Sequence, residues 1–102
     1  MLSSLNQRAA LQTAMLVPNG GGAVSWQTFA LVWVKLTPAG VSDSFGPDAR
    51  ESRARYRIIL RRRWDLAAGQ RLAIEARSFA VHGLIDEGPH EPFVTLLCEE
   101  LP

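Results

Sequence analysis

The chain has 102 residues, of which 47% are hydrophobic and 21% are charged, and its formal net charge at pH 7 is +1. This length allows one domain with a modest core, and the composition excludes a disordered chain. A net charge so close to zero indicates, by itself, neither a nucleic-acid-binding protein nor an acidic surface.

Short apolar runs separated by frequent Gly, Pro, Asn and Asp predict an all-β fold. We expect a single domain over residues 1–102, a small antiparallel β-barrel or sandwich of about six strands. The first strand is expected over residues 8–17. The run Pro18-Asn19-Gly20-Gly21-Gly22 then predicts a hairpin loop, because glycine and asparagine adopt positive φ at little cost.

The second strand is expected over residues 25–36, which are rich in aromatic and β-branched side chains. Every residue from 29 to 34 is apolar, so the alternation of a half-buried strand is absent there. We therefore expect both faces to be covered, one by the core and one by a loop or a neighbouring subunit. A buried helix of the same length is the alternative. Trp26 and Trp33 are expected to pack in the core.

Residues 37–54 predict one long loop, since they are polar and rich in Gly, Pro and Ser. Compact domains keep such long loops chiefly where the loop has a function. Four further strands are expected over residues 55–63, 71–75, 79–85 and 93–99. In the first of these, Tyr56, Ile58 and Leu60 alternate with arginines, which predicts an apolar inner face and a basic outer face.

Residues with catalytic or metal-binding chemistry are scarce. Cys98 is the single cysteine, so no intramolecular disulfide can form, and its apolar neighbours predict a buried thiol. His82 and His90 are the only histidines and do not form a zinc-ligand cluster. We expect no enzyme activity, no metal and no cofactor.

The hydropathy of the chain predicts neither a secretory signal nor a membrane span. The longest apolar run, residues 29–34, is far shorter than the roughly 20 residues that cross a bilayer. We expect the protein to be made and used in the cytoplasm of the cell that produces it.

The charges are distributed unevenly along the chain. Seven arginines lie within residues 50–63, whereas residues 84–102 carry only acidic charges. These patches are a solvated, balanced surface, or they meet head-to-tail between identical subunits, or the arginines face DNA phosphates. The candidates for a DNA channel or subunit interface are Arg50, Arg53, Arg55, Arg57, Arg61 and Arg63. The acidic interface candidates are Asp86, Glu87, Glu91, Glu99 and Glu100.

Taken in order, several short segments resemble the phage head–tail joining protein family, the head-closure (stopper) subunits of tailed phages and phage-like gene transfer agents. They are Leu5-Asn6-Gln7-Arg8, Pro18 to Gly22, Trp26 to Trp33 with Leu36-Thr37-Pro38, Arg55-Tyr56-Arg57-Ile58, Arg71-Leu72, Arg77-Ser78-Phe79-Ala80-Val81, Ile85-Asp86, and Leu96-Leu97-Cys98-Glu99-Glu100. No single segment is specific, but the ordered set covers about residues 5–100.

The resemblance implies a β-barrel that forms a ring in the neck of the particle, beneath the portal, after synthesis in the bacterial host cytoplasm. The implied partners are six or twelve copies of the chain itself, the portal-bound adaptor ring, the tail terminator and packaged double-stranded DNA bound without sequence specificity, with no membrane. The ring would retain the DNA and dock the tail. The loop residues implied to reach the axial channel or the adaptor are Ser42, Asp43, Ser44, Phe45 and Asp48.

Two alternatives stay open at this stage. One is a free-standing OB-like barrel that binds single-stranded nucleic acid, with Trp26, Trp33 or Trp64 as stacking platforms beside the basic strand. The other is the tail-side terminator or completion protein of the same neck.

Overall fold

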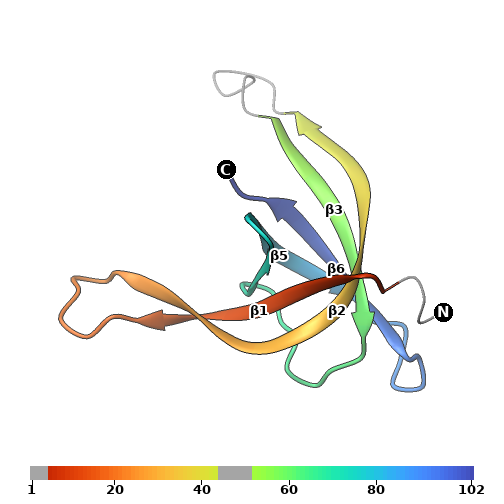
Figure 1. Ribbon diagram of the computed structural model, residues 1–102, viewed down its shortest axis with the longest axis horizontal. Coiled ribbons are helices and arrows are strands. Elements are labelled where there is room, and N and C mark those ends of the chain that lie inside the picture. The colour runs from red at the N-terminus through yellow and green to blue at the C-terminus, as the bar shows by residue number, and fades with distance from the viewer. Residues whose placement is uncertain (1–4, 44–51) are drawn as a thin grey trace.

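A computed structural model describes residues 5–43 and 52–102 of the chain. Six strands form a closed antiparallel barrel in the order β1-β2-β3-β6-β5-β4 (Figure 1). The strands are β1 (Gln7–Leu16), β2 (Val24–Asp43), β3 (Ser52–Arg61), β4 (Arg71–Ile74), β5 (Arg77–Ile85) and β6 (Phe93–Glu100). The all-β prediction with about six strands is confirmed, and the buried-helix alternative for residues 29–34 is excluded.

The core of the barrel follows from alternation along the strands, because every second side chain points inward. In β3, Ile58 and Leu60 are buried between exposed arginines, as the sequence predicts. The largest buried side chain is Phe79, and its ring packs edge-on against Tyr56 with 5.3 Å between the ring centroids. Cys98 lies in the same cluster, which confirms the prediction of a buried thiol.

The prediction of a loop over residues 37–54 is wrong. β2 continues to Asp43 and pairs with β3 from Thr37↔Arg57 to Asp43↔Ser52. The register shifts between Pro38 and Gly40, where Gly40 has a φ of 112°. A bulge accommodates both the missing N–H of proline and a positive φ, so these residues do not end the strand. The connection shortens to residues 44–51, and the candidates Ser44, Phe45, Asp48 and Arg50 lie outside the described residues.

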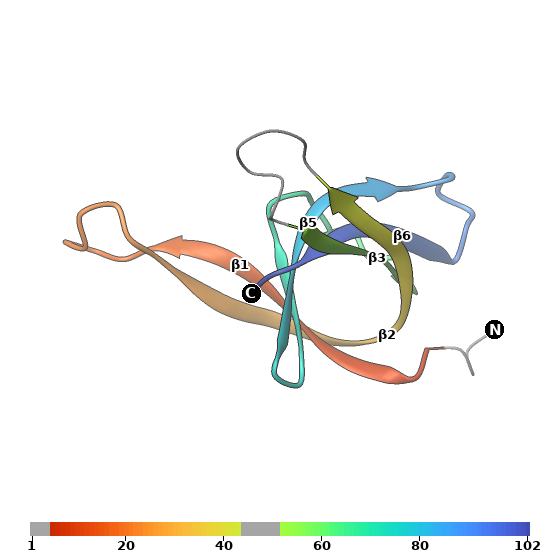
Figure 2. The same cartoon turned by 90° about the horizontal axis from the view of Figure 1, so that it is seen from above.

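The β1–β2 hairpin projects from the side of the barrel (Figures 1 and 2). Its predicted turn is confirmed: the N–H of Val17 donates to the carbonyl of Ala23 at 3.0 Å, and Asn19, Gly21 and Gly22 have positive φ. β4 pairs with β1 only from Ala10 to Gln12. Residues 13–27 therefore extend beyond the barrel as a two-stranded segment, which we call the arm.

The outward position of two tryptophans corrects another prediction. Trp33 and Trp26 were expected in the core, but Trp33 is 50% exposed and Trp26 is half-buried on the outer surface. Val34 is fully buried, so its neighbour Trp33 must point outward. Further along the hairpin, Leu11 pairs with Ala30 but Gln12 pairs with Thr28, so the register of β2 shifts between these pairs and Trp26. Strand register, rather than hydrophobicity, decides which side chains enter the core.

Candidate assembly and DNA-facing site

The outer face of β3 carries a row of exposed arginines, Arg55, Arg57 and Arg61. They lie two and four residues apart, so a strand rise of about 3.3 Å per residue places them along roughly 20 Å of the surface. The backbone of Arg53 continues β3, although its side chain is outside the described set. The structure thus brings three of the six basic candidates together on one face.

Arg63 does not join this row. It follows the end of β3 and forms a bidentate pair with Asp65, in which Nε and Nη2 each donate to one carboxylate oxygen at 2.9 Å. The hydrogen bonds from Arg63 lower the pKa of Asp65 below its usual value. The charge of Arg63 is therefore compensated locally.

A shallow groove of about 410 Å³ lies beside Arg55 and Arg57, and Leu97 and His82 are part of its lining. Glu99 also lines it, with Oε2 at 3.5 Å from Nε2 of His82. Arg55 is the cross-strand partner of Glu99 in the β3–β6 ladder. The basic row is thus bordered by an acidic residue at one end and is most purely basic at Arg57 and Arg61.

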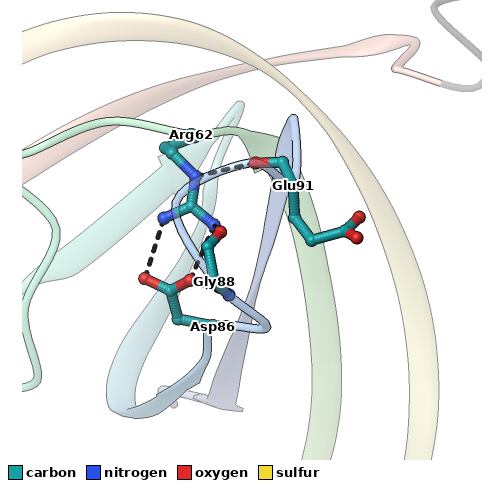
Figure 3. A network of polar contacts seen from close by, with 4 residues as sticks. All are labelled: Arg62, Asp86, Gly88 and Glu91. Carbon is teal, nitrogen blue, oxygen red and sulfur yellow. Dashed lines mark hydrogen bonds and ion pairs between the residues drawn. The ribbon is translucent and has the colours of Figure 1, made fainter.

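Arg62 binds the loop between β5 and β6 (Figure 3). Its Nη1 and Nη2 donate to the two carboxylate oxygens of Asp86 at 2.8 and 2.6 Å, its Nε donates to the Glu91 carbonyl at 2.7 Å, and Nη2 also donates to the Gly88 carbonyl. The hydrogen bond from Arg62, assisted by one from the N–H of Gly88, lowers the pKa of Asp86 to about 2. Asp86 is therefore a structural anchor of this loop.

Arg77 of β5 binds Glu100 at the end of β6. Its Nε and Nη2 donate to Glu100 at 2.8 and 2.9 Å, and Nη2 also donates to the hydroxyl of Tyr56 at 2.9 Å. The guanidinium lies over the rings of Tyr56 and Phe79. The hydrogen bonds from Arg77 lower the pKa of Glu100 below its usual value. Two of the acidic candidates, Asp86 and Glu100, are thus satisfied within the chain.

Glu87 and Glu91 are the acidic candidates that remain available. Both are exposed, and neither carboxylate lies within ion-pair distance of a basic group in the described part of the chain. Figure 3 shows the Glu91 carboxylate pointing away from Arg62, which holds only the Glu91 backbone. Because Arg62 fixes the loop, these two charges are presented to solvent from a defined backbone.

An apolar outer face on β1 and β2 includes part of the run 29–34, for which the sequence predicted a covered outer side. Leu16, Val24, Phe29, Leu31 and Trp33 are all exposed there. Two arginines flank this face by stacking on its indole rings: Arg8 lies 5.1 Å from the Trp33 ring centroid and Arg71 lies 4.1 Å from that of Trp26. The unbroken apolar run at residues 29–34 predicted a cover on its outer face, and in the described part of the chain Phe29, Leu31 and Trp33 are exposed there.

Within residues 5–43 and 52–102, no group of three or more His, Cys, Asp or Glu side chains is placed to hold a metal ion. The same residues include no helix of the length and apolarity needed to cross a membrane.

The sequence matches the family model described as phage head completion protein over residues 2–101. The chain belongs to the phage head completion protein family. This confirms the resemblance noted from the ordered sequence segments. Membership of the family implies a structural role rather than an enzymatic one. A comparison with curated proteins found no match.

A solved structure shares the fold of this head completion protein. A chain of the structure titled "Virion of native gene transfer agent (GTA) particle" superposes with a TM-score of 0.73 at 21% sequence identity, covering 95% of this chain and 96% of that chain. The similarity extends across the whole barrel. In the described part of the head completion protein, the exposed surfaces include Arg57 and Arg61 of β3, the carboxylates of Glu87 and Glu91, and the apolar face of β1 and β2.

Proposed function

We propose that the chain forms a ring of six or twelve copies at the neck of a tailed-phage-type particle. The ring lies between the portal-bound adaptor ring and the tail, retains packaged DNA and docks the tail terminator. The observation that carries this proposal is the match to a head completion family over residues 2–101, nearly the entire chain. The description of that family favours the head side of the neck over the tail-side terminator.

The arginine row of β3 is the part of each subunit suited to face the DNA. Duplex DNA carries about one negative charge per 1.7 Å of axis, and a guanidinium binds phosphate oxygens without reading bases. Arg57 and Arg61 are exposed, and Arg55 continues the row. Repetition around a ring multiplies weak phosphate contacts, so a few arginines per subunit suffice to hold DNA.

Electron microscopy of particles from a producer strain that lacks this gene tests the proposal. We expect heads that have lost their DNA, beside separate and complete tails, and restoration of joined particles by a plasmid copy of the gene. Heads that keep their DNA beside abnormal tails would instead identify a tail-side component. Normal tailed particles would refute any neck function.

The exposure of tryptophans keeps one rival function testable. Trp64 is 94% exposed and Trp33 is 50% exposed, as stacking platforms for single-stranded nucleic acid would be. Trp26 and Trp33, however, already stack against arginines of the same chain. Titration with single-stranded DNA, monitored by tryptophan fluorescence, separates the two functions: the ring proposal predicts no quenching, and strong salt-dependent quenching would support the rival.

A further inference from the structure

The arm has the surface of a buried segment although it extends from the barrel. Residues 13–27 contain no charged residue. Leu16 at its end is 75% exposed, and its cross-strand partner Val24 is also exposed. Among the described residues, β2 pairs with β3 only from Val34 onwards. Residues 24–33 of β2 therefore pair with β1 along one edge, and their other edge is unpaired within the described chain. An uncharged, apolar hairpin with unpaired strand edges is an association site unless another element covers it.

A second surface of the same chain has the complementary character. A groove of about 300 Å³ runs over the outer faces of β5, β6 and β3, and its apolar lining is Leu5, Ile59, Ile85 and Phe93. Glu87 and Glu91 also line it, together with Lys35, so acidic charges outnumber basic ones. Arg62 fixes the loop that carries both glutamates. The groove is therefore apolar, acidic at its rim and held in shape before any partner binds.

Strand β4 supplies the opposite charge beside the root of the arm, because Arg71 pairs with Gln12 of β1. Arg71 stacks on Trp26 at 4.1 Å and makes no ion pair with another described residue. A partner that receives the apolar end of the arm would meet Arg71 next. An apolar groove bordered by the exposed carboxylates of Glu87 and Glu91 matches this order of side chains.

The two surfaces lie at opposite ends of the molecule. In both views, the arm projects to the left, whereas the loop between β5 and β6, drawn in blue, lies to the right (Figures 1 and 2). An element at one end can enter a site at the other end of a neighbouring copy, so each subunit can use its arm on one neighbour and its groove on the next. This use of two neighbours produces a head-to-tail contact, which closes into a ring when the rotation between subunits allows.

We propose that the arm of one subunit packs into the groove of the next copy of the chain, with Leu16 and Val24 against Ile85 and Phe93, and Arg71 beside Glu87 and Glu91. This inference rests on the proposed ring and assigns its subunit contact. It covers Leu16 and Val24 of the apolar face, and it brings Arg71 to two exposed carboxylates that form no ion pair with another described residue.

A photo-cross-link from the arm tests the contact in assembled particles. The variant Leu16→p-benzoylphenylalanine changes a 75% exposed side chain, so the barrel can fold around it. Irradiation should give dimers and higher oligomers of the chain, with the cross-link mapped to peptides that contain Ile85 or Phe93. Cross-links to another protein, to a second arm, or none in particles that contain the variant would overturn the proposal.

Charge variants provide an independent test with a rescue. Arg71→Glu should lower the fraction of joined, DNA-filled particles about tenfold, and Glu91→Arg with Glu87→Arg in the same chain should restore it to within about twofold. Failure of the rescue, with the triple variant folded by circular dichroism, would refute the proposed pairing.

A matched pair of arm variants separates this contact from the proposed function. Leu16→Asp introduces a charge on the face that enters the groove, whereas Gln27→Asp introduces the same charge on the opposite face of the arm, as the register places it. We expect joined particles to be lost only with Leu16→Asp. If deletion of the gene breaks the neck but Leu16→Asp does not, the contact is wrong and the function stands. If deletion leaves the neck intact, the function fails whatever the cross-link shows.

Discussion

Cys98 is the only thiol of the chain, and it faces the interior of the barrel with 3% of its surface exposed. Burial raises its pKa from 9.0 to about 12. At pH 8 this shift lowers the fraction of reactive thiolate about a thousandfold relative to an unfolded chain, since each pKa unit is a factor of ten. We therefore expect modification by a disulfide reagent to be at least about a thousandfold slower in buffer than in denaturant at the same pH.

The same shift makes the stability of the barrel depend on pH in the alkaline range. The folded state keeps the proton of Cys98 where the unfolded state releases it, so stability is complete below pH 9 and falls as the pH rises from 9 towards 12. The loss approaches about 1.4 kcal/mol per pH unit in this window. Urea unfolding at pH 8 and pH 10 should show it in the native chain, and Cys98→Val should remove that part of the difference. Equal pH dependence of the two proteins, or rapid modification of the native thiol, would refute the inward orientation.

Three other outcomes follow from side chains described above. Arg57→Ala with Arg61→Ala should release DNA from filled heads, whereas lysine at both positions should retain it. The measurement is the DNA content of purified heads, and unchanged retention by the alanine variant would exclude a phosphate contact. Asp86→Asn should lower the melting temperature at pH 7, because the ion pair with Arg62 is lost. The difference in melting temperature from the native chain should vanish as the pH falls from about 4 to 2, because Asp86 of the native chain becomes protonated in that range. Phe79→Ala should lower the free energy of unfolding by about 3–5 kcal/mol in urea titrations, because it empties the largest buried position; a loss below about 1 kcal/mol would contradict its central place in the core.

The barrel was predictable because its local signals agree with its long-range pairing. Alternation in β3 identified Ile58 and Leu60 as inward residues, and the glycines after Asn19 identified the hairpin turn. The extension of β2 beyond Leu36 was not predictable in this way. Pro38 and Gly40 have the composition of a loop, and only the ladder with β3 keeps them in a strand.

The site was less predictable than the fold because its residues meet across the barrel. Arg62 and Asp86 are 24 residues apart, and no local spacing indicates that they pair. Whether Trp26 and Trp33 point into or out of the barrel depends on the strand register and on one register shift. The unbroken apolar run has no alternation of polar and apolar residues from which the register could be predicted. The arginine row, in contrast, followed from the two-residue period of β3 alone.

The length of β2 has a mechanical consequence. Twenty residues of strand have a contour of about 60 Å at the usual rise, yet the longest dimension of the molecule is 41 Å, so β2 must curve around the barrel. Its first half pairs with β1, in the arm and on into the barrel, and its second half pairs with β3, which carries the arginine row. One covalently continuous strand thus joins both regions without an intervening loop to absorb strain. The strand bends at its two register shifts, one opposite Leu11 and Gln12 and one between Pro38 and Gly40, so the direction of the arm relative to β3 is determined by these two irregularities.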